Sequence, residues 1–309
     1  MSLLAGARVD NLAPSLAEYM AENRGFVDEA LDRYVPGAHN EPRLLHEAMR
    51  YSLFAGGKRL RPILAIASFE IVGDSNYGVM PLAAALECVH TYSLIHDDLP
   101  AMDDDDLRRG KPTSHKKYGE AVAILAGDAL ITLAFEILSS PEFTRMFPHG
   151  RVLAVIRDVA QASGSTGLIA GQVWDMWFEG RVADEQAVNR IILNKTGALI
   201  RSSLTSGARL AGANLPQLKI FSIYGEKLGM AFQIRDDLLD LEGDTERLGK
   251  NVQKDGKRGK ATYPSLFGAD KARNMIDNLL SEAANAIEPL GKRADTLRLL
   301  TEYIGQRMN

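Results

Sequence analysis

The chain has 309 residues, of which 46% are hydrophobic and 25% charged, and its net charge at pH 7 is −4. This length can bury a large core, and the lack of a basic excess excludes a typical nucleic-acid-binding protein. The single cysteine, Cys88, excludes an intramolecular disulfide and a multi-cysteine zinc site. We therefore expect a reducing, cytoplasmic setting.

Neither the first residues nor the most apolar segment of the chain indicates a membrane protein. The first residues, MSLLAGARVDNLAPS, lack the basic start and apolar stretch of a secretory signal. The most apolar window, 121–138, contains Gly127, Asp128 and Glu136, and buried core helices of this length are common. We expect a core helix there and no stable membrane insertion.

Apolar residues recur with helical spacing along most of the chain. Between Met275 and Ala283, and again between Leu297 and Ile304, they follow the i, i+3, i+4 pattern of one helix face. The long apolar stretches lack the alternation typical of strands, and they cover 61–72, 78–98, 118–138, 196–211 and 216–241. No low-complexity linker divides the sequence. We predict an all-α fold with one domain spanning residues 1–309.

An acidic cluster follows one of these helices. Residues 96–112 read HDDLPAMDDDDLRRGKP. Pro100 ends the helix just after Asp97 and Asp98, so the chain can fold back and bring Asp103 towards them. The alternative is a solvated acidic turn, but closely spaced carboxylates repel one another unless cations offset them. Several oxygen ligands without a Cys or His set indicate Mg²⁺ rather than zinc.

A second acidic cluster lies in the segment 232–240, FQIRDDLLD. Asp236, Asp237 and Asp240 are three or four residues apart, so all three can point to one side of a helix. One such pattern is weak, because amphipathic helices carry it by chance. Two of them, each on a long apolar helix, favour a shared cation site that binds substrate phosphates.

Basic residues gather at two places. GGKRLRP at 56–62 combines a glycine pair with Lys58 and Arg61, and Arg108 and Arg109 follow the first acidic cluster. Glycine lets the backbone approach an anion, and arginine binds phosphate through a bidentate fork. The alternative for 56–62 is a helix end with solvated charges. Together with the acidic clusters, this segment predicts a second diphosphate site.

These segments closely resemble the trans-prenyl (polyprenyl) diphosphate synthase family, and within it the bacterial type of farnesyl diphosphate synthase. The matching pieces lie in family order between residues 56 and 264: GGKRLRP, HDDLPAMDDDDLRRGKP, GDAL, KTG, FQIRDDLLD and LGK…GKATYP. The resemblance implies an isoprenoid synthase fold, a bundle of about ten or more helices around a central cavity. It also implies Mg²⁺, about three ions per active site with substrate bound, and a homodimer.

The resemblance assigns roles to individual positions. Mg²⁺ and the allylic diphosphate would be held by Asp97, Asp98, Asp103, Asp236, Asp237 and Asp240. Further contacts to that diphosphate would come from Arg108, Lys195 and Lys250. The diphosphate of isopentenyl diphosphate would be held by Gly57, Lys58, Arg61, His90 and Arg109. Catalytic contacts near the reacting carbons would come from Lys195, Thr196 and Gln233.

Three more predictions concern the shape of the site. The polar segment Glu242–Thr262, with Lys250 and Lys260, is expected to close over the diphosphates and exclude water. Gly197 makes a local helix break at 195–197 inexpensive, which would expose carbonyl oxygens to the substrate. Tyr92 and Ser93 lie one turn below Asp97, and the resemblance makes Tyr92 the floor that stops elongation at farnesyl diphosphate. The alternative is that Tyr92 is an ordinary residue of the hydrophobic core.

The expected reaction joins isopentenyl diphosphate to dimethylallyl or geranyl diphosphate, head to tail and in trans geometry. The nearest alternative is a geranylgeranyl or longer product. A terpene cyclase would not need the GGKRLRP segment, and a silent subunit of a heteromeric synthase would be expected to have lost some of these residues. A plain divalent-ion-binding protein would leave the basic positions unexplained.

Overall fold

The computed structural model describes residues 16–73, 77–243 and 259–306, and Lys250 lies outside them. The α-helices of the first half are α1 (Leu16–Tyr34), α2 (Arg43–Leu53), α3 (Leu60–Val72), α4 (Met80–Asp97), α5 (Ser114–Tyr118), α6 (Glu120–Ser139), α7 (Pro141–Met146) and α8 (His149–Ser163). Those of the second half are α9 (Leu168–Phe178), α10 (Glu185–Ile192), α11 (Ala198–Ala211), α12 (Leu215–Glu242), α15 (Tyr263–Phe267), α16 (Ala269–Ile287) and α17 (Asp295–Gln306).

Short irregular elements connect these helices. They are 3₁₀ turns at Tyr77–Val79 and Glu288–Ala294 and a π-helical turn at Leu193–Gly197. There is also a hairpin of two short strands, β1 (Leu107–Arg108) and β2 (Lys111–Pro112), with two residues each. The all-α prediction is confirmed, and the five long apolar stretches coincide with α3, α4, α6, α11 and α12 to within two or three residues. The hairpin was not predicted, because two-residue strands are too short to show alternation.

Local sequence signals explain where the long helices begin and end. Pro81 occupies the first turn of α4, where its missing N–H costs nothing. Helix α12 starts with a capping box, in which Asn214 and Gln217 satisfy each other's backbone N–H groups. It ends at Gly243 in the left-handed conformation (φ 79°), a common helix stop.

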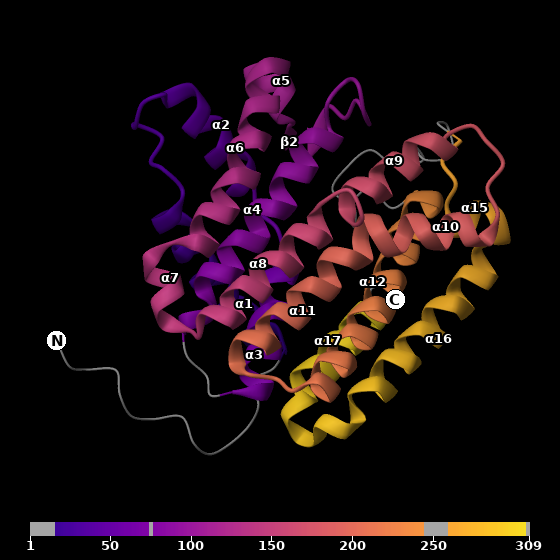
Figure 1. Ribbon diagram of the computed structural model, residues 1–309. Helices are drawn as coiled ribbons and strands as arrows, with labels where there is room; N and C mark the ends of the chain where they lie inside the picture. Colours follow the sequence, from indigo (N-terminus) through magenta and orange to yellow (C-terminus); the bar gives the residue numbers. More distant parts are fainter. Residues whose placement is uncertain (1–15, 74–76, 244–258, 307–309) are drawn as a thin grey trace.

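Two hydrophobic clusters form the core and meet at α3 and α11. The first surrounds α4 and α6, and the second surrounds α12 and α16. In Figure 1 the indigo-to-magenta half of the chain lies on one side and the orange-to-yellow half on the other. Helix α3 buries ten of its thirteen residues, with Ile66 in one cluster and Leu64 in the other. These shared helices support the proposal that the chain forms a single domain.

Helix α6 carries the apolar window noted in the sequence. Among the described residues, the segment Glu120–Met146 is long and apolar enough to cross a membrane, and 44% of its most apolar window is buried inside the structure. Its buried face includes Ala126, Leu130 and Ala134, which pack in the first cluster. Ile124 and Leu125 lie on the opposite, exposed side.

Candidate active site

The first acidic cluster lies where α4 ends. The helix stops at Asp97, Asp98 is its C-cap, and Pro100 begins the following turn. The chain then folds back, because the Asp103 N–H donates to the Asp97 carbonyl at 2.8 Å and the Asp105 N–H donates to the Asp98 carbonyl at 3.2 Å. The predicted reversal of the chain is confirmed, and it brings Asp103 beside Asp97.

A cavity of about 310 Å³ lies between this turn and α12. It contains charged side chains from both acidic clusters together with several cations. The predicted site residues that line it are Arg61, His90, Ser93, Asp97, Asp103, Arg108, Arg109, Lys195, Thr196, Gln233, Asp236, Asp237 and Lys260. Side chains from Arg61 to Thr262, far apart in the sequence, therefore share one cavity.

The π-helical turn Leu193–Gly197 presents Lys195 and Thr196 to this cavity. The helix is widened here rather than broken, so the predicted interruption at 195–197 takes the form of a π turn, a feature common at functional sites. Helix α9 approaches this turn closely: a Cβ on Gly171 would lie 2.1 Å from the Lys195 backbone nitrogen. Only glycine permits this contact without a backbone shift.

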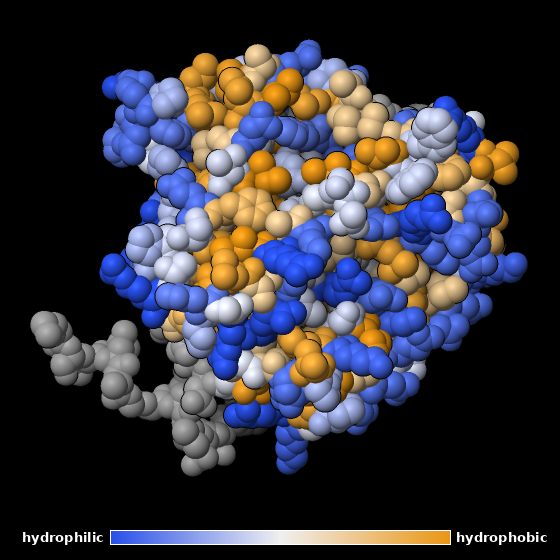
Figure 2. Space-filling model, in the orientation of Figure 1, coloured by the Kyte–Doolittle hydropathy of each residue, from blue (hydrophilic) through white to orange (hydrophobic). Residues whose placement is uncertain are grey.

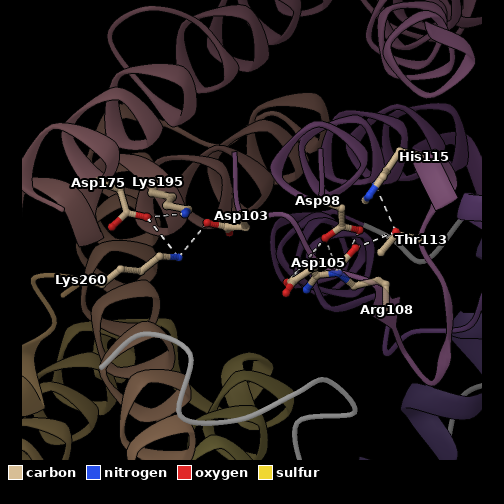
Figure 3. Close-up of polar contacts among 9 residues, drawn as sticks. All are labelled: Asp98, Asp103, Asp105, Arg108, Thr113, His115, Asp175, Lys195 and Lys260. Atoms are coloured by element: carbon tan, nitrogen blue, oxygen red, sulfur yellow. Dashed lines mark hydrogen bonds and ion pairs between the residues drawn. The ribbon is translucent and has the colours of Figure 1, made fainter. Parts of the chain in front are cut away.

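Opposite charges alternate along the cavity. Lys195 Nζ lies 2.6 Å from Asp175 Oδ2, and Lys260 Nζ lies 3.0 Å from Asp103 Oδ1 and 4.0 Å from Asp175 Oδ2. Figure 3 shows these four residues as one chain of contacts, built from α9, the π turn, the acidic turn and the segment before α15. Burial opposes the charge on Lys195, but the carboxylates of Asp175, Asp97 and Asp103 outweigh it and raise its pKa.

Thr196 and Gln233 are oriented by a short hydrogen-bond chain. The Thr196 hydroxyl donates to Gln233 Oε1 at 2.5 Å, and Gln233 Nε2 donates to Asp237 Oδ1 at 2.7 Å. Because the Thr196 proton is engaged with Gln233, the lone pairs of its oxygen are free to face the cavity. The Thr196 oxygen therefore offers partial negative charge to whatever the cavity binds.

A second cavity of about 430 Å³ adjoins the first. The two share Arg61, His90, Arg109 and Phe232 as lining residues. The second cavity also contains Gly57 and Lys58, so the predicted basic segment lies at its wall. Gly57 has φ 130°, and a Cβ there would lie 2.7 Å from the Arg109 guanidinium. Glycine at this position allows the Arg109 guanidinium to approach the backbone closely and donate to the Gly56 carbonyl.

Known proteins are similar to this chain in both sequence and architecture. A family model described as polyprenyl synthetase matches residues 42–295. The chain belongs to the polyprenyl synthetase family.

Relatives in this family carry different product names. A farnesyl diphosphate synthase of Escherichia coli (strain K12) is 45% identical over 91% of this chain and 95% of its own length. A geranylgeranyl diphosphate synthase of Cyanophora paradoxa is 42% identical over 96% of this chain and 97% of its own. The solved structure of an FPP/GFPP synthase from Zymomonas mobilis superposes with a TM-score of 0.84 at 39% identity, covering 94% of this chain and 98% of that one.

Among the described residues, three predicted site residues line neither of these two cavities: Asp98, Asp240 and Tyr92. Asp98 is 3% exposed and is ion-paired with Arg108, which also reaches Asp105. In Figure 3 this group lies apart from the one around Lys195. Burial raises the pKa of Asp98 to about 6, against the opposing pull of Arg108. Asp98 thus holds Arg108 in place, and metal binding by Asp98 remains only a prediction.

Asp240 and Tyr92 are buried at the edges of the site. Asp240 is 3% exposed, one turn beyond Asp236 on α12. Tyr92 is 5% exposed, its hydroxyl donates weakly to the Ser163 carbonyl at 3.5 Å, and its ring meets His96 edge-on at 5.8 Å. Ser93, next to Tyr92, does line the cavity.

Two acidic residues of the site were missed in the sequence. Asp175 lines the first cavity and pairs with Lys195, and Glu87 lines the second and pairs with Arg59. Each is the only acidic residue well inside an apolar helix, LIAGQVWDMWF for α9 and MPLAAALECVHTYSLIHD for α4. Because a buried charge is rare without a partner, this isolation was the available signal.

The oxygen donors of the first cavity suit Mg²⁺ bound together with a diphosphate. Asp97, Asp103, Asp236 and Asp237 all line it. Within the described part of the chain, no three His, Cys, Asp or Glu side chains converge closely enough to hold a metal ion by themselves. Mg²⁺ usually takes only a few carboxylates and completes its shell with water and substrate phosphates. The residues therefore fit an ion whose other ligands come from substrate.

His90 stands at the boundary of the two cavities. Burial, followed by the nearby guanidinium groups of Arg61 and Arg109, lowers the pKa of His90 well below its ordinary value of 6.5. The ring is therefore neutral at pH 7. It can donate one hydrogen bond to an anion while adding no charge of its own.

This neutral histidine should make stability pH-dependent. Below pH 6.5 the unfolded chain binds a proton at His90 that the folded protein excludes, so stability is lost as pH falls. The loss from this group is at most about 1.4 kcal/mol per pH unit. We expect His90→Gln to reduce the difference in unfolding free energy between pH 7.5 and 5.5, measured by urea denaturation. His149→Gln, at an exposed position, is the control; an equal change in both variants would contradict this account.

Proposed function

We propose that the chain transfers an allylic prenyl group from its diphosphate to isopentenyl diphosphate, with farnesyl diphosphate as the product. One observation carries this proposal: two cavities with cationic walls share Arg61, His90, Arg109 and Phe232. Acidic pairs from both clusters line only one of them. This asymmetry suits one diphosphate that leaves with metal assistance and a second that is only held.

The first cavity suits the allylic substrate. Its diphosphate would be contacted by Lys195, Lys260 and Arg108, with Lys250 proposed to join them from outside the described residues. Asp97, Asp103, Asp236 and Asp237 would hold Mg²⁺, with Asp98 and Asp240 proposed to contribute, about three ions per site. When bound, these ions would neutralise the charge that develops on the leaving diphosphate. Water exclusion would come from closure of the Glu242–Thr262 segment, whose described end includes Lys260.

The reaction itself asks the protein to stabilise separated charge. The bond between carbon 1 and oxygen of the allylic substrate breaks, and its electron pair leaves with diphosphate. The isopentenyl double bond attacks the resulting cation, and the adjacent carbon loses a proton, for which the released diphosphate is the proposed acceptor. Preorganised dipoles are the main tool for such a step. The Thr196 oxygen, fixed by Gln233, supports this role because its lone pairs are free to face the cation.

The second cavity suits isopentenyl diphosphate. Lys58, Arg61 and Arg109 provide positive charge, and His90 a neutral donor. Placing this diphosphate beside Lys58 would direct its hydrocarbon tail towards the shared residue Phe232 and the allylic carbon. The relatives' names leave geranylgeranyl diphosphate as the alternative product. Farnesyl diphosphate is favoured by Tyr92, a bulky buried side chain near Asp97.

The first test is direct. We expect the protein, incubated with Mg²⁺, isopentenyl diphosphate and dimethylallyl or geranyl diphosphate, to form farnesyl diphosphate, identified by chromatographic sizing. Asp236→Ala should lower turnover by about two orders of magnitude or more, because electrostatic stabilisation of the leaving group is lost. Asp277→Ala, at an exposed position on α16, is the matched control. Near-normal turnover of Asp236→Ala with an unchanged circular dichroism spectrum would refute a metal site shared by the two acidic clusters.

Product length provides a second test. Replacing Tyr92 by alanine removes a ring next to Ser93, which lines the cavity. We expect Tyr92→Ala to shift the product from farnesyl to longer diphosphates, detected by the same chromatography. A product of unchanged length would show that Tyr92 is an ordinary core residue and does not limit the product.

We also propose a homodimer. Exposed apolar residues lie on the neighbouring helices α6, α8 and α9, and they include Ile124, Leu125, Leu153, Val173 and Trp177, each at least 43% exposed. Figure 2 shows hydrophobic side chains gathered on the face over these helices. An apolar face of this kind, on helices whose other sides pack in the core, favours a second copy of the chain as the partner.

This dimer can be tested by charge insertion. Leu125→Glu would place a carboxylate in the proposed interface, and we expect it to convert a dimer to a monomer in sedimentation velocity experiments. Leu266→Glu, 39% exposed on α15, is the control and should leave the mass unchanged. A wild-type monomer, or a dimer that survives Leu125→Glu, would argue against this interface.

A further inference from the structure

Arg59, in the middle of the GGKRLRP segment, lines the second cavity, but its guanidinium is bonded to acceptors within the protein. Its side chain is 2% exposed and donates three hydrogen bonds: from Nε to Asp28 Oδ1 at 2.8 Å, from one terminal nitrogen to Glu87 Oε1 at 2.8 Å, and from the other to the Leu53 carbonyl at 2.7 Å. These acceptors belong to α1, α4 and α2. Arg59 therefore fastens the start of α3 to three other helices.

The backbone around Arg59 needs such an anchor. Arg59 itself has φ 50° and Gly57 has φ 130°, so the turn from Gly56 to Arg61 contains a left-handed conformation that a side chain disfavours. This turn carries Gly57, Lys58 and Arg61, the proposed contacts to isopentenyl diphosphate. Strained backbone persists only where its surroundings hold it. The contacts of Arg59 supply that restraint.

Glu87 has a second oxygen that is not used in this anchor. Glu87 is 1% exposed and lines the second cavity, and its Oε2 has no hydrogen-bond partner among the described residues. Arg61 Nε, in the same cavity, is likewise buried without one. Burial lowers the pKa of Arg61 to about 10, and Glu87 is the strongest opposing influence. The carboxylate is thus bonded to Arg59, and its charge attracts Arg61 without a direct hydrogen bond.

We propose that Glu87 is a positioning residue for isopentenyl diphosphate. Through Arg59, one oxygen holds the Gly56–Arg61 turn in place, and the negative charge of the carboxylate attracts the Arg61 guanidinium in the same cavity. This inference rests on the proposed function, since it assigns Glu87 to the site of the non-ionising substrate. Glu87 is not expected to touch either substrate.

The sign of the effect separates this role from a simple charge effect. Glu87 is an anion near an anion-binding site, so neutralising it would tighten diphosphate binding if only long-range electrostatics mattered. In Glu87→Gln the amide oxygen can still accept from Arg59, but a neutral acceptor makes a weaker bond than a carboxylate, and the attraction on Arg61 is lost. The Gly56–Arg61 turn and the Arg61 guanidinium are then held less firmly. Positioning therefore predicts weaker binding of isopentenyl diphosphate.

The test compares binding and turnover. We expect Glu87→Gln to raise both the KM and the calorimetric Kd for isopentenyl diphosphate about tenfold or more, with the allylic KM changed by less than about twofold. Glu70→Gln is the control: it neutralises a carboxylate that accepts from Tyr19 between α1 and α3, outside both cavities. An unchanged or lower Kd in Glu87→Gln, or an equal rise for both substrates, would overturn the inference.

A double variant separates position from stability. Arg59→Met with Glu87→Leu replaces a buried ion pair by apolar side chains, an exchange that often preserves stability. We expect its melting temperature to remain near that of the wild type while the Kd for isopentenyl diphosphate stays raised. A wild-type Kd in this stable double variant would show that the pair does not position the site, and would overturn the proposal.

Failure of the proposed function would look different. A wild-type protein that neither binds nor elongates isopentenyl diphosphate would overturn the proposed function, and this inference with it. A wild-type protein that binds it, with an affinity that Glu87→Gln leaves intact, would overturn only the role of Glu87.

Discussion

The compensation of carboxylates by cations within one cavity is the constraint on which the rest of this structure depends. Asp97 and Asp103 share a cavity with Asp236 and Asp237, and like charges at such proximity oppose folding unless they are offset. Lys260 beside Asp103 supplies part of that offset. The same arrangement suits a bound diphosphate with its metal ions, because oxygen ligands and ammonium groups are already placed around one space.

A rigid apolar frame is needed to hold these charges in place. Helices α4 and α12 end their long buried segments at the acidic clusters, and α3 and α11 join the two halves of the core. Close-packed interiors yield little, so the cavity walls keep their separation. Gly171 lets α9 touch the π turn, which points Lys195 at the cavity. Gly171 and the π turn thus position one side chain of the cavity, and the long apolar helices hold the cavity walls as a whole.

The two cavities differ in how their charges are balanced. In the first cavity, acidic side chains are numerous, and in the proposed function they would share metal ions with substrate. In the second, the basic turn is anchored by Arg59, whose charge is matched by Asp28 and Glu87. This leaves Lys58 and Arg61 to face the cavity. Under the proposed function, this division would let one cavity promote the departure of a diphosphate while its neighbour only retains one.

The amino-acid sequence by itself determined the helical fold and most of the site. Hydrophobic periodicity located the long helices, and Pro100 predicted both the end of α4 and the return of Asp103, because these are consequences of local backbone sterics. Motif resemblance then named most of the cavity's charged residues. Such signals are contained within short segments of chain.

Other features were decided only by the tertiary structure. Asp98 lies next to Asp97 in sequence, yet it turns to Arg108. Asp175 and Glu87 acquired their roles from Lys195 and Arg59, which are twenty and twenty-eight residues away in sequence. Which partner a carboxylate finds depends on how distant helices pack, and no local sequence pattern predicts that packing. The sequence therefore identified which groups carry charge, and only the fold decided which of them face the cavity and which hold the others in place.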